Sequence, residues 1–505
     1  MVSVARHKTA IARNQLSTPM QMLARHGFLD GEHSILDYGC GRGDDIAILE
    51  EAELPVRGWD PHYAPDTNLS EPADVVNLGF VLNVIEEPSE RTETLRKAFG
   101  LCRRCLSVAV MIAGRVRIDE MQVYRDGHVS QRGTFQKYYA QSELMQFVRK
   151  TIGVEPVTVA PGVVFVFRDE LAEQRFFRNR YRREPRLAQL LEIVSPLTVK
   201  RARSRQTVTE QYWETLQGLW QKAIELGRLP AEDELTPEIG EPVTNELGSV
   251  RRAAALARRA FGLKAFNEAK AARTEDLTVY FALEAFNRRP RYRELPMELQ
   301  RDIKAFFGAY KYAAEAGREL LFSLGQPETI HRACQAAAEQ GLGYLDGDHS
   351  LQLDASLLDR LPAPLRVYVG CAERLYGDTD AADLVKIHIQ SGKLTLSRFD
   401  DFEGKPLPAM VERIKIKLRQ LDVDFFDYSR QHIPPLLYLK SRYMAPDQAG
   451  YKQQRAFDEK LLALEEFDFS SYGPDSQIFQ RTLQERKLAV RGFDLVPGEI
   501  GALDP

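Results

Sequence analysis

A glycine-rich turn at residues 35–45, ILDYGCGRGDD, constrains the fold of this chain more than any other stretch. It leads from an apolar segment through three alternate glycines, Gly39, Gly41 and Gly43, to a pair of aspartates. Between a strand and a helix, glycines let the backbone turn sharply and let a ligand approach without obstruction by Cβ atoms. The stretch therefore predicts a strand–loop–helix unit that binds a ligand.

Strand-like and helix-like patterns alternate over residues 31–170. After the glycine-rich turn, apolar strand candidates recur at PVRGWD, ADVVNLGF, LSVAVMIAG and GVVFVFRD, with helical patterns among them. Apolar runs without strict alternation indicate a parallel sheet that helices cover on both faces. We expect a Rossmann-like α/β domain here, preceded by a lead-in helix within residues 1–30.

After residue 170 the pattern of apolar and charged residues changes twice. Residues 171–343 are basic and show mainly helical spacing of apolar residues. Residues 344–505 suggest a mixed α+β domain with strands at LRVYVGCAERLYG, ADLVKIHIQSGKLTLSRFDDF and HIPPLLYLKSRYM. The second of these segments predicts a hairpin that turns at Ser391 and Gly392. A chain of 505 residues has room for about three domains of ~150 residues in addition to the lead-in helix.

Net charge, cysteine content and hydropathy limit the partners and the cellular compartment that we expect. The net charge is −4, so a nucleic-acid surface would have to be local. Five cysteines are too few and odd in number for a disulfide framework, which favours a reducing cytoplasm. The start of the chain lacks the apolar core of a signal peptide, and no apolar run approaches the ~20 residues that span a bilayer. We expect a soluble cytoplasmic protein without a membrane partner.

The residues of the turn discriminate between ligands. A P-loop would need a Lys-Ser/Thr pair, and a dinucleotide fingerprint would need one more residue between its second and third glycines. Asp44 and Asp45 would lie in the first helical turn, where they would oppose a pyrophosphate. A ligand that carries an ammonium and a sulfonium fits this acidic loop better, with Asp37 at the strand end to meet its charge.

A second acid supports this reading. Asp60 ends the next strand about 20 residues after the glycines, where a carboxylate accepts hydrogen bonds from both ribose hydroxyls. Together the two features predict S-adenosyl-L-methionine as donor and S-adenosyl-L-homocysteine as product, with no metal. The predicted donor-binding residues are Asp37, Gly39, Cys40, Gly41, Asp44, Asp60, Pro61, Asn77 and Leu78. Two simpler interpretations exist. The glycine-rich turn could be only a tight connection between a strand and a helix, and Asp37 could be a helix-capping or turn residue.

The pattern resembles the class I methyltransferase fold over about residues 34–169. A narrower resemblance, to the DNA phosphorothioation-associated methyltransferase family, covers nearly the whole chain. It is carried by RHKTAIARNQLSTP, DYGCGRGDD, GWDPHYAPD, ADVVNLGFVLNVIEEPSER, GTFQKYYAQSEL, APGVVFVFRDE, ELPMELQRDIKAFFGAYKYA, LRVYVGCAERLYG and ADLVKIHI. The resemblance implies binding of S-adenosylmethionine and a link to modified DNA or phage defence. It implies nucleic acid as partner, DNA first and RNA second, together with proteins of phosphorothioation systems.

The acceptor side carries weaker signals. Neither the [DNS]PP[YFW] motif of amino-directed DNA methyltransferases nor the Pro-Cys of cytosine-C5 enzymes occurs at residues 73–87. Asn77, Lys137 and Tyr138 are the candidates for catalysis, the last two within RGTFQKYYAQSEL, whose aromatic side chains could stack an extruded base. The alternative is that Phe135 and Tyr139 pack under the following helix while Lys137 is solvated.

A basic run at residues 175–186, RFFRNRYRREPR, mixes arginines with aromatic side chains and is a candidate nucleic-acid surface. The candidate contacts are Arg178, Arg180, Arg182 and Arg183. A solvated linker helix explains the run equally well.

Three further patterns favour a structural reading. Cys102 and Cys105 have the spacing of half a zinc site but lack a second pair, so we expect packing residues at a helix end. FDDFEG at residues 399–404 loosely resembles a magnesium nuclease site. HIPPLLY at residues 432–438 is more typical of a rigid turn before a strand than of an amine-binding motif; the phosphorothioation-associated family carries Asn-Pro-Pro there.

The sequence therefore predicts an S-adenosylmethionine-dependent methyltransferase that acts on nucleic acid. Two alternatives stay open at this point. The chain could bind S-adenosylmethionine without turnover, as a DNA-binding accessory or sensor protein, or it could methylate RNA or a small molecule.

Overall fold

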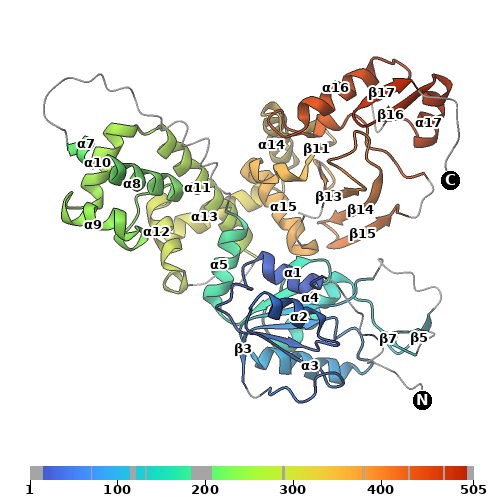
Figure 1. The fold of residues 1–505 in the computed structure, drawn as a ribbon, viewed down its shortest axis with the longest axis horizontal. Coiled ribbons are helices and arrows are strands. Elements are labelled where there is room, and N and C mark those ends of the chain that lie inside the picture. The colour runs from blue at the N-terminus through green and yellow to red at the C-terminus, as the bar shows by residue number, and fades with distance from the viewer. Residues whose placement is uncertain are drawn as a thin grey trace. The chain divides into compact units, whose positions relative to one another are not determined.

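The computed structural model describes residue 9 and residues 15–69, 71–113, 121–130, 133–182, 208–286, 291–377, 379, 382–429, 433–469 and 473–497. The chain divides into two compact units, which are drawn in Figure 1. Unit 1 combines Met1–Ala172 with Leu324–Pro505, and unit 2 is Glu173–Ser323. The four-part division expected from the sequence stays a prediction.

The first sheet of unit 1 is Rossmann-like, with strands in the order β2-β1-β3-β4-β9-β8. The first four of these run parallel, whereas β9 is antiparallel to both of its neighbours. The bounds are β1 (Ile35–Tyr38), β2 (Val56–Trp59), β3 (Ala73–Gly79), β4 (Cys102–Ala109), β8 (Val157–Ala160) and β9 (Val163–Phe167). Because β2 and β3 flank β1 on opposite sides, a crevice opens at the carboxyl ends of these three strands. The predicted Rossmann-like fold is confirmed.

Helices accompany this sheet in the alternation that the sequence predicts. They are α1 (Thr18–Arg25), α2 (Asp44–Glu51), α3 (Pro88–Gly100) and α4 (Gln141–Ile152). Every residue of β1 and of β9 is buried, which is why these strands appear in the sequence as unbroken apolar runs. Their core includes Leu36, Val76 and Leu106, none of which is accessible to solvent.

A small antiparallel sheet lies between β4 and α4 along the chain. Its strands are β5 (Gln122–Tyr124), β6 (Gly127–Val129) and β7 (Phe135–Gln136). A Cβ on Gly127 would lie 2.5 Å from the ring of Phe135, so this hairpin closes tightly over that aromatic side chain. The small sheet brings residues 135–137 beside the crevice of the first sheet.

The later half of unit 1 is built on an antiparallel sheet whose six strands follow chain order. They are β10 (Tyr344–Asp346), β11 (Ser350–Asp354), β12 (Leu384–His388), β13 (Lys393–Phe399), β14 (Met410–Lys417) and β15 (Asp422–Asp427). The remaining elements are α14 (Pro327–Glu339), η4 (Ala355–Arg360), α15 (Ala363–Tyr376), η5 (Lys440–Tyr443), α16 (Tyr451–Leu462), α17 (Ser476–Glu485), β16 (Leu488–Arg491) and β17 (Asp494–Pro497). One face of the sheet packs on α14 and α15 in an apolar core. The predicted mixed α+β region is confirmed, as is the hairpin at Ser391 and Gly392.

The predicted strand LRVYVGCAERLYG is wrong, because the segment forms helix α15. Residues on every side of this helix are buried, among them Val367, Tyr368 and Val369. A helix that is buried all round has no polar face, so its apolar run looks like a strand. The helix packs on α4 and β8, where a Cβ on Gly377 would lie 2.5 Å from the Cα of Ala160.

The strand predicted for HIPPLLYLKSRYM is also wrong. The described segment from Ile433 onward makes an isolated bridge between Ala409 and Leu436, belongs to no named strand, and then forms η5. Pro434 and Pro435 have no backbone N–H to donate to a sheet. Leu439 lies in the left-handed region with φ 50°, which ends any extended run.

Unit 2 is helical, as predicted. Its elements are α5 (Glu170–Arg180), α7 (Val208–Gln211), α8 (Trp213–Leu226), η2 (Glu232–Glu234), α9 (Pro237–Asn245), α10 (Val250–Phe261), α11 (Lys264–Glu284), η3 (Tyr292–Glu294), α12 (Met297–Phe306) and α13 (Tyr310–Ser323). One apolar core joins α8 to α10 and the start of α11 through Trp220, Ala257 and Ala265. The prolines of residues 230–242 lie around η2 and within α9, so this segment is partly helical itself.

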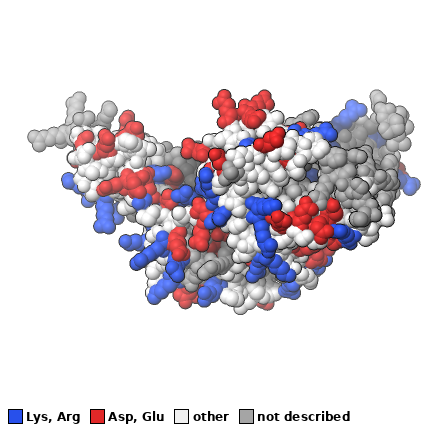
Figure 2. All heavy atoms as spheres, turned by 90° about the horizontal axis from the view of Figure 1, so that it is seen from below, with Lys and Arg blue, Asp and Glu red and all other residues white. Residues whose placement is uncertain are grey.

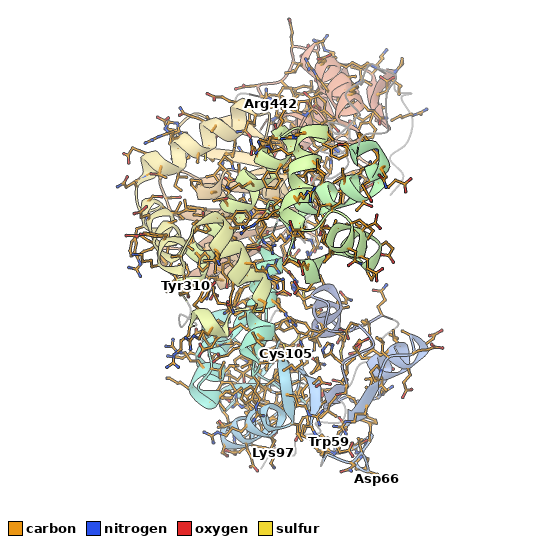
Figure 3. The ribbon with its side chains drawn as sticks, turned by 90° about the vertical axis from the view of Figure 1, so that its left-hand side faces the viewer. Trp59, Asp66, Lys97, Cys105, Tyr310 and Arg442 are labelled. Carbon is orange, nitrogen blue, oxygen red and sulfur yellow. The ribbon has the colours of Figure 1, made fainter. Side chains whose placement is uncertain are left out.

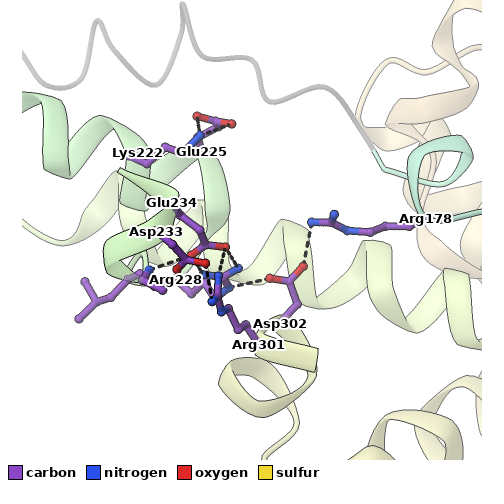
Figure 4. A network of polar contacts seen from close by, with 10 residues as sticks. Arg178, Lys222, Glu225, Arg228, Asp233, Glu234, Arg301 and Asp302 are labelled. Atoms are coloured by element: carbon purple, nitrogen blue, oxygen red, sulfur yellow. Dashed lines mark hydrogen bonds and ion pairs between the residues drawn. The ribbon is translucent and has the colours of Figure 1, made fainter. Parts of the chain in front are cut away.

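A buried ionic network holds helices of unit 2 together (Figure 4). Arg228 donates from Nε to Asp302 at 2.6 Å and from both terminal nitrogens to Glu234 at 2.7 Å. Arg178 also reaches Asp302, at 3.3 Å. Burial by itself raises the pKa of Glu234, but its hydrogen bonds with Arg228 and with a backbone N–H lower that pKa to about 2. The glutamate is therefore ionised throughout the physiological range.

The structure shows the surroundings of the two cysteines and of the acidic FDDFEG segment, for which the sequence favours structural roles. Cys102 and Cys105 are buried on β4, so the predicted helix-end position is wrong. Asp400 and Asp401 shape the turn after β13, where they accept from the backbone N–H groups of Ala409 and Gly404. Within the described ranges no cluster of three histidine, cysteine or acidic residues could hold a metal. No helix there is long and apolar enough to cross a bilayer.

Candidate active site

A cavity of about 670 Å³ lies in the crevice at the carboxyl ends of β1, β2 and β3. This volume is in the range of small-molecule sites. The labelled side chains of Trp59 and Lys97 in Figure 3 are part of its wall. Of the predicted donor-binding residues, Gly39, Cys40, Gly41, Asp44, Asp60 and Pro61 line the cavity. Asp37, Asn77 and Leu78 do not line it.

The glycine loop forms the floor of this cavity. Gly39, Gly41 and Gly43 all have positive φ, at 93°, 56° and 84°. A Cβ on Gly39 would lie 2.3 Å from Cγ2 of Val81, so a larger residue would collide there as well as strain the backbone. The N–H groups of Gly39 and Cys40 both donate to the carbonyl of Trp59, at 2.7 and 3.1 Å. The loop is thus tied to the end of β2.

Asp60 organises the neighbouring loop. Its Oδ1 accepts from the backbone N–H groups of His62 and Tyr63, at 2.8 and 2.9 Å. Its Oδ2 accepts from the N–H of Gly41 at 3.2 Å. Each carboxylate oxygen has two lone pairs, and the side chain lines the cavity, so it can also accept from ligand hydroxyls.

Asp37 and Asn77 form a buried pair behind the floor. They are opposite each other on β1 and β3, and Nδ2 of Asn77 donates to Oδ1 of Asp37 at 2.8 Å. Both side chains are almost inaccessible to solvent. Their place in the structure is to join two strands beneath the loop, and direct contact with a donor stays a prediction.

Phe80 carries backbone strain at the cavity wall, a feature without a signal in the sequence. It follows β3 and has φ 59°, a left-handed conformation that costs a bulky residue of order 1 kcal/mol or more. Its N–H is fixed by the carbonyl of Ala109 at 2.8 Å. Positive φ at a non-glycine residue clusters at functional sites, and here it turns the chain so that residues 79–85 form one wall.

The far wall holds a polar pair that the sequence did not single out. Asn83 and Gln136 both line the cavity, beside Met111. Nδ2 of Asn83 donates to Oε1 of Gln136 at 2.8 Å. The Oδ1 of Asn83 is buried and has no hydrogen-bond partner in the described part of the chain. Water does not reach this oxygen, so a rotation of the Asn83 amide toward the cavity would be needed for it to accept from a ligand N–H or O–H.

The catalytic candidates Lys137 and Tyr138 lie next to this wall and not in it. Lys137 is buried and not solvated, and its Nζ pairs with Glu143 at 2.8 Å and with Asp126 at 3.2 Å. Burial lowers the pKa of Lys137, but the two carboxylates outweigh that effect and raise it. A lysine that keeps its proton in this way is unsuited to be a general base. Phe135 and Tyr139 are fully buried, as the packing alternative predicts.

Arg91 completes this network from α3. It donates to both carboxylate oxygens of Asp126, at 2.6 and 2.7 Å, and to the hydroxyl of Tyr139 at 3.3 Å. The turn between β5 and β6 is therefore clamped to α3 and to the start of α4. The role of the lysine is to hold the small sheet beside the cavity, while Gln136 on β7 faces into it.

The cavity is rich in carboxylates. Among the described residues, the acidic side chains that line it are Asp44, Asp45, Asp60, Glu90 and Glu93. The cationic side chains among them are Arg42 and Lys97, and Lys97 is paired with Glu93 at 2.7 Å. Asp44 and Asp45 occupy the first turn of α2, as predicted. This charge balance opposes a phosphate-bearing nucleotide and favours a ligand with positive charge.

Cys40 offers a chemical check on these charges. Burial, and then the carboxylates of Asp37 and Asp60, raise the pKa of its thiol to about 12. Although the side chain lines the cavity, almost no reactive thiolate is present at pH 8. We expect iodoacetamide at pH 8 to modify Cys40 at least roughly 100-fold more slowly than in urea-unfolded protein, as followed by peptide mass spectrometry. Equal rates in the two states would contradict the proposed charge environment.

The residues of the basic run at 175–186 have different surroundings in the structure. Phe176, Phe177 and Tyr181 are buried in unit 2, and the cavity that Tyr181 lines, of about 20 Å³, is too small to hold a base. Arg178 is paired with Asp302. Burial, and then Arg178, lower the pKa of Arg182, and Arg180 lies over the ring of Phe176. Arg183 lies outside the described residues. On the face drawn in Figure 2, basic and acidic side chains are interspersed, without a broad basic patch among the described residues.

No protein-family model and no curated protein matches this sequence. Solved structures do resemble its first domain. A methyltransferase for 1,6-didemethyltoxoflavin from Burkholderia thailandensis, crystallised with S-adenosylhomocysteine, shares 16% identity over 31% of this chain and 93% of its own, with a TM-score of 0.21. A sugar N-methyltransferase from Streptoalloteichus shares 13% over 32% and 96%, with a TM-score of 0.24. A magnesium protoporphyrin IX methyltransferase from Synechocystis, with bound S-adenosylhomocysteine, shares 15% over 32% and 93%, with a TM-score of 0.23.

These neighbours are methyltransferases with different substrates. At such TM-scores the likeness carries no argument about what this chain binds or does. The fold assignment rests on the strand order of the first sheet, and the ligand on the side chains of its cavity.

Proposed function

We propose that this protein is an S-adenosylmethionine-dependent methyltransferase whose donor site is the cavity at the carboxyl ends of β1, β2 and β3. The observation that carries the proposal is the combination of a left-handed glycine loop with a carboxylate-rich wall in one cavity of sufficient size. The loop allows close approach of a nucleoside, and the acids favour its positive charge. When bound, the donor supplies an electrophilic methyl group on a sulfonium.

The residues of the cavity fit this donor. Asp60 is placed to accept from ribose hydroxyls, and the loop of Gly39 and Gly41 passes beside it. Asn83 lines the same cavity, and we propose that its unpaired Oδ1 accepts from the group that receives the methyl once the amide rotates toward the cavity. Since the donor is already activated, catalysis rests on positioning and electrostatics.

Nucleic acid, DNA first and RNA second, is the acceptor class that we propose. The support is the resemblance to the DNA phosphorothioation-associated methyltransferase family, which also suggests proteins of phosphorothioation systems as partners. A local basic surface would suffice for such an acceptor despite the net charge of −4.

Binding and turnover test the proposal in two steps. Calorimetry should show a complex with S-adenosylhomocysteine, and methyl-labelled S-adenosylmethionine should label plain DNA, phosphorothioated DNA or RNA. If neither donor nor product binds folded protein while a phosphate-bearing nucleotide does, the proposal fails. Tight donor binding without transfer to any nucleic acid or small molecule would instead identify a sensor.

Asn83→Ala separates acceptor contact from donor binding. We expect the rate of methyl transfer to fall roughly 10-fold or more, because one buried hydrogen bond to the acceptor is lost. The affinity for S-adenosylhomocysteine, measured by calorimetry on the same preparation, should stay within about twofold, since Asp60 and the glycine loop are unchanged. Equal losses in both quantities would show that Asn83 supports the cavity as a whole.

A further inference from the structure

A second cavity, of about 510 Å³, lies on the antiparallel sheet in the later half of unit 1. The sheet has two unlike faces. One is the apolar core with α14 and α15, whereas the other carries an aligned row of polar side chains across four strands. In that row Lys415 is opposite Thr395, Thr395 opposite Lys386, and Lys386 opposite Gln352. Arg413 lies on the same face, two residues before Lys415.

The opposite wall of this cavity is apolar and aromatic. It comes from the segment that was wrongly expected to form a strand and from residues after α16. Tyr438, Tyr443 and Phe469 are its largest side chains, and all three are buried. The cavity therefore has a cationic side and an aromatic side, at a volume typical of small-ligand sites.

Three cations of this cavity have no counter-ion within the described part of the chain. Among the described residues, Arg413, Lys415 and Arg442 form no ion pair with a carboxylate. Arg413 lies over the rings of Phe426 and Tyr428, and its Nε is buried without a hydrogen-bond partner. Among the described residues of the wall the acid is Asp475, which is engaged at the N-terminus of α17, where it accepts from the N–H groups of Gln477 and Ile478.

The nearby acids are engaged elsewhere. Asp424 is opposite Lys415 in the register but pairs with Lys417 at 2.8 Å. Glu412 pairs with Arg398 at 3.4 Å. Gathering uncompensated cations around a cavity is costly unless an anion enters and accepts from them.

We propose that this cavity binds a nucleoside phosphate, with its phosphate held by Arg413 and Lys415 and its base and sugar against the aromatic wall. The ligand is a free nucleotide or the terminal nucleotide of a strand, which share this chemistry. The site is separate from the donor cavity and does not depend on the proposed methyl transfer. Arginine matches phosphate by paired hydrogen bonds, and aromatic side chains stack bases.

The titration of His388 can report the binding of a phosphate in this cavity. It lines the cavity, and its Nε2 lies 3.0 Å from Oγ1 of Thr395. Burial, and then Lys386, Lys393 and Lys415, lower its pKa to about 4. A phosphate dianion near these lysines would offset their field and move the imidazole titration, followed by NMR, to higher pH.

The test is calorimetry on the full chain with saturating S-adenosylhomocysteine, so that the donor cavity does not compete. The ligands are AMP, adenosine, inorganic phosphate and a 5′-phosphorylated oligodeoxynucleotide. We expect AMP or the oligonucleotide to bind, with adenosine and phosphate each at least roughly 10-fold weaker. Preference for AMP indicates a free nucleotide, and preference for the oligonucleotide indicates a strand terminus. Absence of binding by both, or phosphate as tight as AMP, overturns the proposal.

Variants locate the binding. Arg413→Gln and, separately, Lys415→Gln should each weaken the tighter ligand roughly 10-fold or more, because a charge-assisted hydrogen bond is lost. Lys417→Gln is the matched control, since Lys417 lies on the same strand, is paired with Asp422 and Asp424, and does not line the cavity. Unchanged affinity in both test variants, with melting temperatures like that of the wild type, would overturn the proposal.

Discussion

Asp60→Ala is expected to weaken the binding of S-adenosylhomocysteine by roughly 100-fold. The carboxylate would lose two charge-assisted hydrogen bonds from the ribose, each worth about 1.5–3 kcal/mol, and part of this loss is recovered by water. It would also release the N–H of Gly41, which it now holds at 3.2 Å, and so loosen the glycine loop. Calorimetry with wild type and variant in the same buffer measures the change, and labelled methyl transfer should fall with it.

Asp66→Ala is the control for this substitution. Asp66 belongs to the same loop and is labelled in Figure 3, but it is exposed and does not line the cavity. Its removal takes away the same charge a few residues further on, so its affinity should match that of the wild type within about twofold. Equal affinity of Asp60→Ala and the wild type would show that the ribose is not held at the end of β2.

Arg228→Met is expected to destabilise unit 2 by about 3–5 kcal/mol, the usual cost of removing one partner from a buried ion cluster. Methionine keeps much of the length of the side chain but leaves buried Asp302 and largely buried Glu234 with fewer donors. Arg178 and Arg301 contact the same carboxylates at 3.3 and 3.5 Å and would compensate only in part. Urea unfolding followed by tryptophan fluorescence in a Trp59→Phe background, in which the remaining tryptophans Trp213 and Trp220 belong to unit 2, reports this loss.

Lys222→Met is the matched control in the same unit (Figure 4). Its ion pair with Glu225, at 3.0 Å, is half-exposed, and we expect a change in the free energy of unfolding of about 0.5 kcal/mol or less.

The dependence of stability on acid pH gives a second readout of the Arg228 network. Because the folded-state pKa of Glu234 lies below its ordinary value, the stability that it contributes is present above about pH 4.5 and is lost as pH falls toward about 2. Arg228→Met should reduce this part of the acid dependence, because only the N–H of Ala231 and Arg301 would still stabilise the carboxylate. An unchanged acid profile would contradict the assigned network.

The donor cavity was predictable because its residues are close together in the sequence. The glycines, Asp60 and the two aspartates at the start of α2 belong to two consecutive strand–loop units. Parallel strands bring such loops to one edge of a sheet whatever the rest of the chain does. Asp37 shows the limit of this reasoning, since its position on β1 was predicted but its burial under the loop depends on Asn77 from another strand.

The far wall with Asn83 and Gln136, and the second cavity, were not predictable in this way. Asn83 and Gln136 are 53 residues apart and meet only because Arg91, Asp126 and Lys137 clamp the small sheet. Arg413 and Tyr443 face one cavity because a proline-containing segment that looked like a strand crosses the sheet.

Local chemistry in the sequence alone determined the glycine loop, the alternation of strands and helices, the acidic first turn of α2 and the hairpin of β12 and β13. Backbone conformation at glycine and the period of apolar residues act over a few positions, so a sequence states them directly. Tertiary structure alone decided that α15 is a helix, that Lys137 pairs with Asp126 and Glu143, and that Arg413 and Lys415 line a cavity without an ion pair among the described residues. Burial and ion pairing depend on which distant side chains arrive, and that information exists only once the chain has packed.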